Sequence, residues 1–164
     1  MKLGLDTSVL IASVKKRGEK YHSSALGLAE VFQKLGHIGV ASSLLLIELP
    51  GALASTKMPI EKIFETEVSL QENFNLEIMS YENHVDTTLS LIFEFRDLKR
   101  RLGIGAVDFH HLATSIDEGC LSFVTVDERH LLRGETREAL RKYIEILGPR
   151  EAVQNLGGRE TVSG

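Results

Sequence analysis

The stretch KLGLDTSVLIASVKK, residues 2–16, decides the fold that the rest of the chain extends. Its first four residues lean apolar and suit a short strand, and Asp6 follows them directly. After it, Leu10 and Val14 recur at helical spacing and predict an amphipathic helix over residues 7–16. The chain therefore opens with a strand that leads at once into a helix, and a carboxylate stands at the junction.

Short apolar runs and helical spacing alternate along the rest of the chain. The short runs predict strands at residues 38–41, 76–79, 121–126 and 143–147. The helical spacings predict one helix ending near Gly36 and others over residues 42–55, 59–73, 106–118 and 135–141. Residues 82–101 are expected to form one long amphipathic helix. This alternation predicts an α/β fold, a three-layer α/β/α sandwich around a central, mostly parallel sheet.

The length of 164 residues suits one domain with one hydrophobic core. Residues 1–149 are predicted to form that domain. Residues 150–164 are predicted to be a short tail, a turn of helix followed by partly disordered chain. A composition of 43% hydrophobic and 26% charged residues is that of an ordinary globular protein.

Several protein classes are disfavoured by the same numbers. No apolar run approaches the roughly 20 residues needed to cross a bilayer, so no membrane association is expected. Asp6 interrupts the start before a signal-peptide apolar region could form, which favours a cytoplasmic protein. Cys120, the single cysteine, cannot form an intramolecular disulfide and is expected to be a small buried residue. A formal charge of -4 argues against coating nucleic acid by bulk electrostatics, so any such contact must be local.

Two carboxylates follow predicted strands. Asp6 ends the first strand and Asp127 ends the strand at 121–126, so both should project at one edge of a parallel sheet, where ligands bind in open α/β sheets. Either residue alone could instead cap the turn or helix that follows. The pair is therefore suggestive of a shared site and not decisive.

Two further acids lie in predicted helices. Glu48 has Leu44 and Ala52 at one-turn spacing on either side, so its carboxylate should be partly buried and in need of a cation or donors, unless it reaches water from a helix end. Asp108 lies in a first helical turn, where the helix dipole alone would favour it. Clustered with Asp6 and Asp127, these acids would repel one another unless a hard divalent cation lay among them, and Mg²⁺ or Mn²⁺ is the natural occupant.

Four segments, in order and spacing, resemble the four acidic motifs of the PIN-domain ribonucleases, a family that includes the toxins of VapBC toxin–antitoxin pairs. The segments are Leu5–Ile11, Ser42–Leu49, Ala106–Ala113 and Phe123–Asp127. The resemblance runs from about Leu3 to Pro149. It implies that Asp6, Glu48, Asp108 and Asp127 coordinate Mg²⁺ or Mn²⁺ and that Thr125 supports the site. Two features depart from the family: the aromatic often found shortly after the fourth acid is absent, and residues 82–101 form a longer segment than in the smallest members.

The resemblance implies metal-dependent hydrolysis of RNA phosphodiester bonds, with a homodimer and, in the toxin branch, a small antitoxin as partner. A non-catalytic PIN-like scaffold that binds RNA or protein is the alternative, although a scaffold has no need for clustered carboxylates. A haloacid-dehalogenase-like phosphatase also places an aspartate after its first strand. That family needs a second aspartate two residues later, where this chain has Ser8.

An acidic site that cuts a polyanion needs cations at its margin. The candidates for RNA binding are Lys15 and Lys16 after the first helix and Arg129 and Arg133 after Asp127, although charge runs are commonly solvated helix faces. His111 lies one helical turn beyond Asp108, at a spacing that could serve a metal. Helix packing is the commoner role for such a histidine. His130 has no partner that the sequence identifies.

Overall fold

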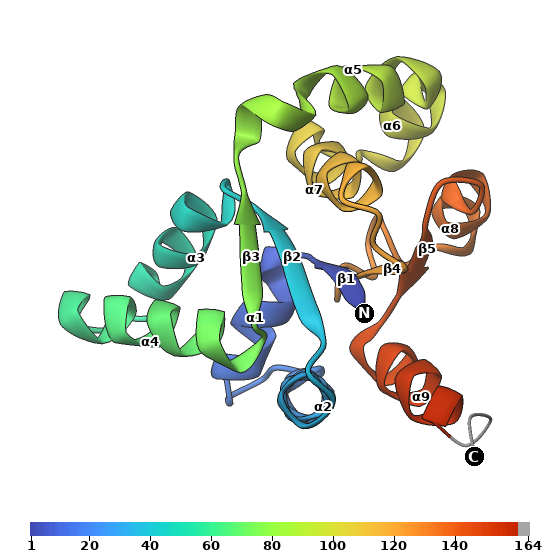
Figure 1. Ribbon diagram of the computed structural model, residues 1–164. Coiled ribbons are helices and arrows are strands. Elements are labelled where there is room, and N and C mark those ends of the chain that lie inside the picture. The colour runs from blue at the N-terminus through green and yellow to red at the C-terminus, as the bar shows by residue number, and fades with distance from the viewer. Residues whose placement is uncertain (161–164) are drawn as a thin grey trace.

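The central feature is a five-stranded sheet in the order β3-β2-β1-β4-β5 with every neighbouring pair parallel (Figure 1). The computed structural model describes residues 1–160, and the side chains up to residue 157. The strands are β1 (Lys2–Leu5), β2 (Ile38–Ser42), β3 (Leu76–Met79), β4 (Ser122–Val124) and β5 (Glu145–Leu147). Each lies at or within two residues of its predicted position, and the three-layer α/β/α sandwich is confirmed.

Helices cover both faces of the sheet. One core joins helices α1 (Thr7–Val14), α2 (His22–Leu35), α3 (Leu45–Ala54), α4 (Ile60–Asn73) and α9 (Pro149–Glu160) to the sheet. The other core involves helices α5 (Val85–Glu94), α6 (Arg96–Leu102), α7 (Ala106–Asp117) and α8 (Gly134–Leu140), which gather on the opposite side in Figure 1. None of the described helices has the length and apolar character that crossing a membrane requires.

Close packing of α7 against β1 sets the position of the α7 N-terminus. A Cβ atom at Gly4 would lie 2.0 Å from Ser115 Oγ, so only glycine lets this helix approach the strand so closely. Phe109 and Leu112 of the same helix are fully buried in the second core. The first turn of α7 is thereby held beside the carboxyl edge of the sheet.

The single helix predicted for residues 82–101 is wrong. The chain instead forms a 3₁₀ turn (Tyr81–His84), then α5 and α6 with a break at Phe95, where φ is −101° and ψ is 22°. The Phe95 ring packs edge-on against Tyr143, with ring centroids 6.1 Å apart. The bend lets Leu98 reach the core, whereas Phe93, predicted to pack, is 69% exposed. A tertiary contact therefore overrides the local helical pattern.

The C-terminal segment is also more regular than the short turn of helix expected after Glu151. Pro149–Glu160 forms helix α9, which packs along α2. Ala152 and Leu156 are buried in the first core, and Arg137 of α8 donates two hydrogen bonds of 2.8 Å to the Glu151 carboxylate. These contacts explain why the helix persists. The disorder expected toward residue 164 concerns residues 161–164, which lie outside the described residues.

Candidate metal centre

Asp6 is fixed at the junction between β1 and α1. Its backbone N–H donates to Val124 O at 3.0 Å, which continues the β1–β4 pairing past the end of the strand. The hydroxyls of Ser8 and Thr125 each donate to Asp6 Oδ2 at 2.6 Å. Asp6 is 9% exposed and Thr125 is fully buried, so the carboxylate is held in one orientation by neighbours that cannot easily move.

Asp127 lies beside Asp6 because the same threonine contacts both residues. The Asp127 backbone N–H donates to Thr125 Oγ1 at 3.1 Å. Its side-chain Oδ1 accepts the N–H groups of Arg129 and His130, at 2.9 and 3.1 Å, and Oδ2 lies 2.9 Å from His130 Nδ1. Thr125 thus links the acids at the ends of β1 and β4, as a supporting hydroxyl would.

Asp108 lies in the first turn of α7, and its Oδ2 accepts the Gly105 N–H at 2.7 Å. Burial raises the pKa of this carboxyl above its usual range, and the negative charges of Asp6 and Asp127 raise it further. The Gly105 hydrogen bond acts in the opposite direction and does not prevent the rise. Burial and the neighbouring acids thus both disfavour the ionised form of Asp108.

The negative charge of Glu48 is balanced by a neighbouring side chain of the protein. It lies on α3 and accepts hydrogen bonds from Thr7 Oγ1 at 2.7 Å and His111 Nε2 at 2.8 Å. Burial opposes ionisation of Glu48, but the hydrogen bond and charge of His111 outweigh it and lower the Glu48 pKa. The His111 ring is itself buried, which disfavours its charge, yet the bond to Glu48 and the nearby acids raise the pKa of His111. His111, which the sequence offered as a possible metal ligand, instead pairs with Glu48.

The donor set fits a divalent cation. Among the described residues, one group of three brings metal-binding atoms within 4.8 Å of one another: Asp108, Asp127 and His130. Two carboxylates and an imidazole can each donate an electron pair to a cation, and a positive charge would relieve the repulsion that raises the Asp108 pKa. Asp6 adjoins this group through Thr125, whereas Glu48 is joined to it through His111. The sequence analysis missed His130; its signal was a histidine three residues after a predicted ligand.

The four cations predicted at the margin are all exposed, and none forms an ion pair with a described residue. Arg129 lies in the loop after Asp127, and Arg133 precedes α8. Lys15 and Lys16 follow α1, so Lys15 lies about 13 Å along the helix direction from Asp6. The arginines are therefore close neighbours of the acids, and the lysines are more distant.

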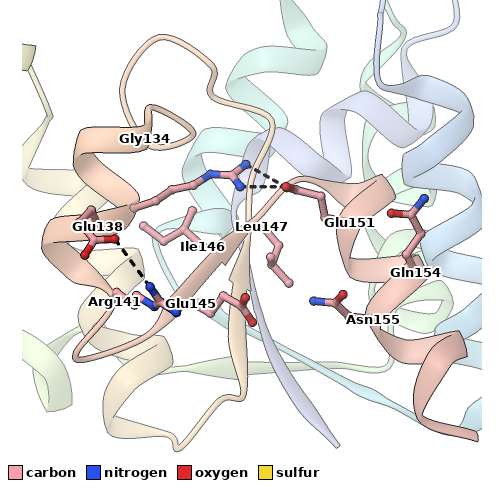
Figure 2. A pocket seen from close by; sticks show the side chains of 10 residues that line it. Gly134, Glu138, Arg141, Glu145, Ile146, Leu147, Glu151, Gln154 and Asn155 are labelled. Atoms are coloured by element: carbon pink, nitrogen blue, oxygen red, sulfur yellow. Dashed lines mark hydrogen bonds and ion pairs between the residues drawn. The ribbon is translucent and has the colours of Figure 1, made fainter.

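A hollow of the surface lies elsewhere, beside edge strand β5 and between α8 and α9 (Figure 2). Its volume is about 380 Å³. Two ion pairs line this hollow, since Arg137 pairs with Glu151 and Arg141 lies 3.8 Å from Glu138. None of the four predicted acids lines it, so we place the candidate site at the carboxyl edge of the sheet, where Asp6, Asp108 and Asp127 meet.

Comparison with known proteins finds a matching family model and similar solved structures. A family model described as PIN domain matches residues 4–135, a span that contains the four acids and Thr125. The fold is similar to a chain in the crystal structure of VapBC2 from Rickettsia felis bound to a DNA fragment from their promoter, with a TM-score of 0.60 and 18% sequence identity. That match covers 90% of this chain and 98% of the other. Comparison with curated proteins gives no match. At such low identity the structural likeness establishes the fold alone.

Proposed function

This chain belongs to the PIN domain family, and from that premise we propose that it is a metal-dependent endoribonuclease that hydrolyses phosphodiester bonds in RNA. PIN domains are generally nucleases. The observation that carries the proposal is the convergence of Asp6, Asp108 and Asp127 at one edge of the sheet, with the pKa of Asp108 raised by burial and by its acidic neighbours. Clustered carboxylates with a perturbed pKa are more frequent at functional sites than elsewhere in proteins.

We propose Mg²⁺ or Mn²⁺ as the cofactor, held by Asp108 and Asp127 with Asp6 beside them and Glu48 as the predicted fourth acid. When bound, such a cation makes a water molecule more acidic and stabilises the negative charge that develops on the phosphate. The remaining work is done by the chain. Thr125 and Ser8 keep Asp6 in place through two hydrogen bonds of 2.6 Å. Asp108 is proposed to orient the attacking water, since the Gly105 N–H fixes its carboxylate at the edge of the site.

Glu48 and His111 have a different part in the proposal. The pair carries little net charge, so Glu48 adds less repulsion to the site than an unpaired acid would. His111 also supplies a cationic group among the acids before any cation binds. We propose that this pair keeps the fold stable without metal while leaving one Glu48 oxygen, Oε1, directed away from the bonds described.

RNA is proposed to approach over Arg129 and Arg133, with Lys15 and Lys16 contacting phosphates farther along the strand. Their exposure and lack of ion pairs with described residues support this role. An RNA substrate implies action in the cytoplasm. Replacing Arg129 by glutamate should weaken RNA binding and flatten its dependence on salt, because each lost phosphate contact releases one counterion fewer. Arg150, which is also exposed but lies on α9, offers a control substitution.

We also propose a homodimer and a small antitoxin as partners. Exposed apolar side chains support protein contacts: Phe64 and Val68 on α4 are 59% and 56% exposed, and Phe93 on α5 is 69% exposed. The similar chain comes from VapBC2 bound to a DNA fragment from their promoter, and that assembly is a property of VapBC2. Light scattering of the wild type, Phe64→Glu and Phe93→Glu tests the dimer. A wild type with the mass of one chain would contradict it, and a variant that becomes monomeric would locate the interface.

The test of the proposed activity is cleavage of a mixed RNA pool with Mg²⁺, with Mn²⁺ and with EDTA. Wild type should cut only with metal, and Asp6→Asn and Asp127→Asn should abolish cutting. Asp86→Asn, an exposed acid in the first turn of α5, should cut normally. Metal-independent cutting, or full activity in the Asp127 variant, would refute the proposal. A folded protein that binds RNA without cutting would favour the non-catalytic scaffold.

A further inference from the structure

Both the backbone and the ring of His130 are fixed beside the acidic site. Its backbone N–H donates to Asp127 Oδ1 at 3.1 Å, and its carbonyl accepts Thr136 Oγ1 at 2.7 Å. The Thr136 side chain is fully buried in α8, so the backbone at His130 is tied to the second core. The ring is 25% exposed, which leaves it reachable from solvent but not free to swing away.

The opposite side of the ring is set by the turn that leads into α7. Gly103 has a φ of 73°, a left-handed conformation that favours glycine. A Cβ at Gly103 would lie 3.8 Å from His130 Nε2, so the ring rests against this turn. The same turn continues to Gly105, whose N–H fixes Asp108. The imidazole is therefore enclosed between the loop that carries Asp127 and the turn that positions Asp108.

Resting on the proposed metal-dependent function, we infer that His130 is a direct nitrogen ligand of the cation, which gives the site a preference for Mn²⁺ over Mg²⁺. The motif resemblance supplied four oxygen ligands and no nitrogen. The geometry adds one, because a ring nitrogen of His130 lies within 4.8 Å of the ligand atoms of both Asp108 and Asp127. Asp127 Oδ2 and His130 Nδ1 are 2.9 Å apart, close to the roughly 3 Å that separates neighbouring ligands around a cation with bonds of about 2.1 Å.

The chemistry of the donor set decides the preference. Mg²⁺ binds almost entirely through oxygen and gives up its water ligands reluctantly, whereas imidazole is a good ligand for transition metals. In the metal-free protein, Nδ1 lies within hydrogen-bonding distance of Asp127 Oδ2, at 2.9 Å. A neutral ring that carries its hydrogen on Nε2 would offer the Nδ1 electron pair to a cation held by Asp127. Without the imidazole, the site would be an ordinary oxygen site with little reason to distinguish the two metals by ligand type.

Two measurements on the full chain test the inference without relying on activity. Calorimetric titration should give a Mn²⁺ affinity at least about tenfold above the Mg²⁺ affinity. His130→Ala should lower the Mn²⁺ affinity by about 10- to 100-fold and change the Mg²⁺ affinity by less than about threefold, by analogy with other changes around metal ligands. Pulsed electron paramagnetic resonance of bound Mn²⁺ should detect a ¹⁴N coupling in the wild type that His130→Ala removes.

Two further variants keep the result interpretable. His130→Gln retains a side-chain donor for Asp127 and should preserve the loop while still losing the ¹⁴N coupling. His22→Ala removes a histidine on α2 that bonds to Ala12 O and should leave the coupling intact. Circular dichroism confirms that each variant is folded.

The outcomes separate the inference from the function on which it rests. Bound Mn²⁺ without a ¹⁴N coupling, or a coupling that survives in His130→Ala, overturns the role of His130. Metal-dependent RNA cleavage would then still stand. A folded wild type that binds neither metal and cuts no RNA would instead overturn the proposed function itself.

Discussion

Replacing Asp108 by asparagine is expected to raise the free energy of unfolding of the metal-free protein at neutral pH. The side chain keeps its shape, and the asparagine oxygen can still accept the Gly105 N–H. What disappears is a negative charge that lies within 4.8 Å of an Asp127 ligand atom. Two such charges at that separation repel by about 1 kcal/mol at the dielectric constant of water and by about 3.5 kcal/mol at an effective constant of about 20.

Losing the favourable interaction of Asp108 with the α7 dipole offsets about 0.3–1 kcal/mol of this gain. The net increase should be about 1–3 kcal/mol, which corresponds to a rise in Tm of about 3–10 °C. The pH dependence has a defined sign. Because the pKa of Asp108 is raised in the fold, its protonated form stabilises the fold at low pH, and this stability is lost as pH rises through the folded pKa. The advantage of the variant should therefore grow with pH.

Urea denaturation in EDTA, followed by circular dichroism from pH 4 to pH 8, measures the effect. Asp86→Asn is the matched control, since Asp86 also lies in a first helical turn but is exposed, and it should change stability by less than about 0.5 kcal/mol. With saturating Mn²⁺ the order should reverse, because the wild type gains more from cation binding. If Asp108→Asn is no more stable than the wild type in EDTA at pH 8, burial and the neighbouring acids do not disfavour the ionised Asp108 carboxylate in the fold.

Three further predictions concern the rest of the fold. Hydrogen bonds from Arg137 lower the pKa of Glu151, so Glu151→Gln should reduce stability by about 0.5–1 kcal/mol at pH 7 after allowance for solvent screening. In denaturation curves this difference should vanish as pH falls through the lowered pKa. Burial raises the pKa of the Cys120 thiol to about 12, so an aromatic disulfide reagent at pH 8 should react far more slowly with folded than with urea-unfolded protein. Leu156→Ala should lower the free energy of unfolding, measured by thermal unfolding, by about 2–4 kcal/mol. The exposed Gln154→Ala is the control and should lower it by less than about 0.5 kcal/mol. Equal effects of the two substitutions would mean that α9 adds nothing to the core.

The sheet was predictable because buried parallel strands are short apolar runs, and such runs alternate with helical spacing along this chain. The break between α5 and α6 at Phe95 could not be predicted, because the Phe95 ring packs against Tyr143, which is far away in the sequence. The full length of helix α9 could not be predicted for a related reason. Its sequence includes Gly157 and few apolar residues, and its stability comes from burying Leu156 against α2.

The candidate site divides in the same way. Acids that directly follow strands are brought to one edge by the parallel topology itself, so the meeting of Asp6 and Asp127 could be deduced from their positions. The hydrogen-bond partners of His111 and His130 could not be deduced from the sequence. His111 on α7 reaches Glu48 on α3 although the two helices belong to different cores, and His130 meets Asp127 through a loop conformation that no periodicity encodes.

The central position of β1 also has a consequence for how the protein is made. The first strand synthesised pairs with β2 on one side and with β4, the fourth in chain order, on the other. The hydrogen bonds through Thr125 that link Asp6 to Asp127 can therefore form only after both of those residues have been synthesised. At about 5–20 residues per second, translation from Asp6 to Asp127 takes roughly 6–24 s, and the ribosome must release these residues before they pair. A nascent chain lacks a complete acidic centre throughout that interval, so the proposed nuclease activity can begin only after Asp127 has been made.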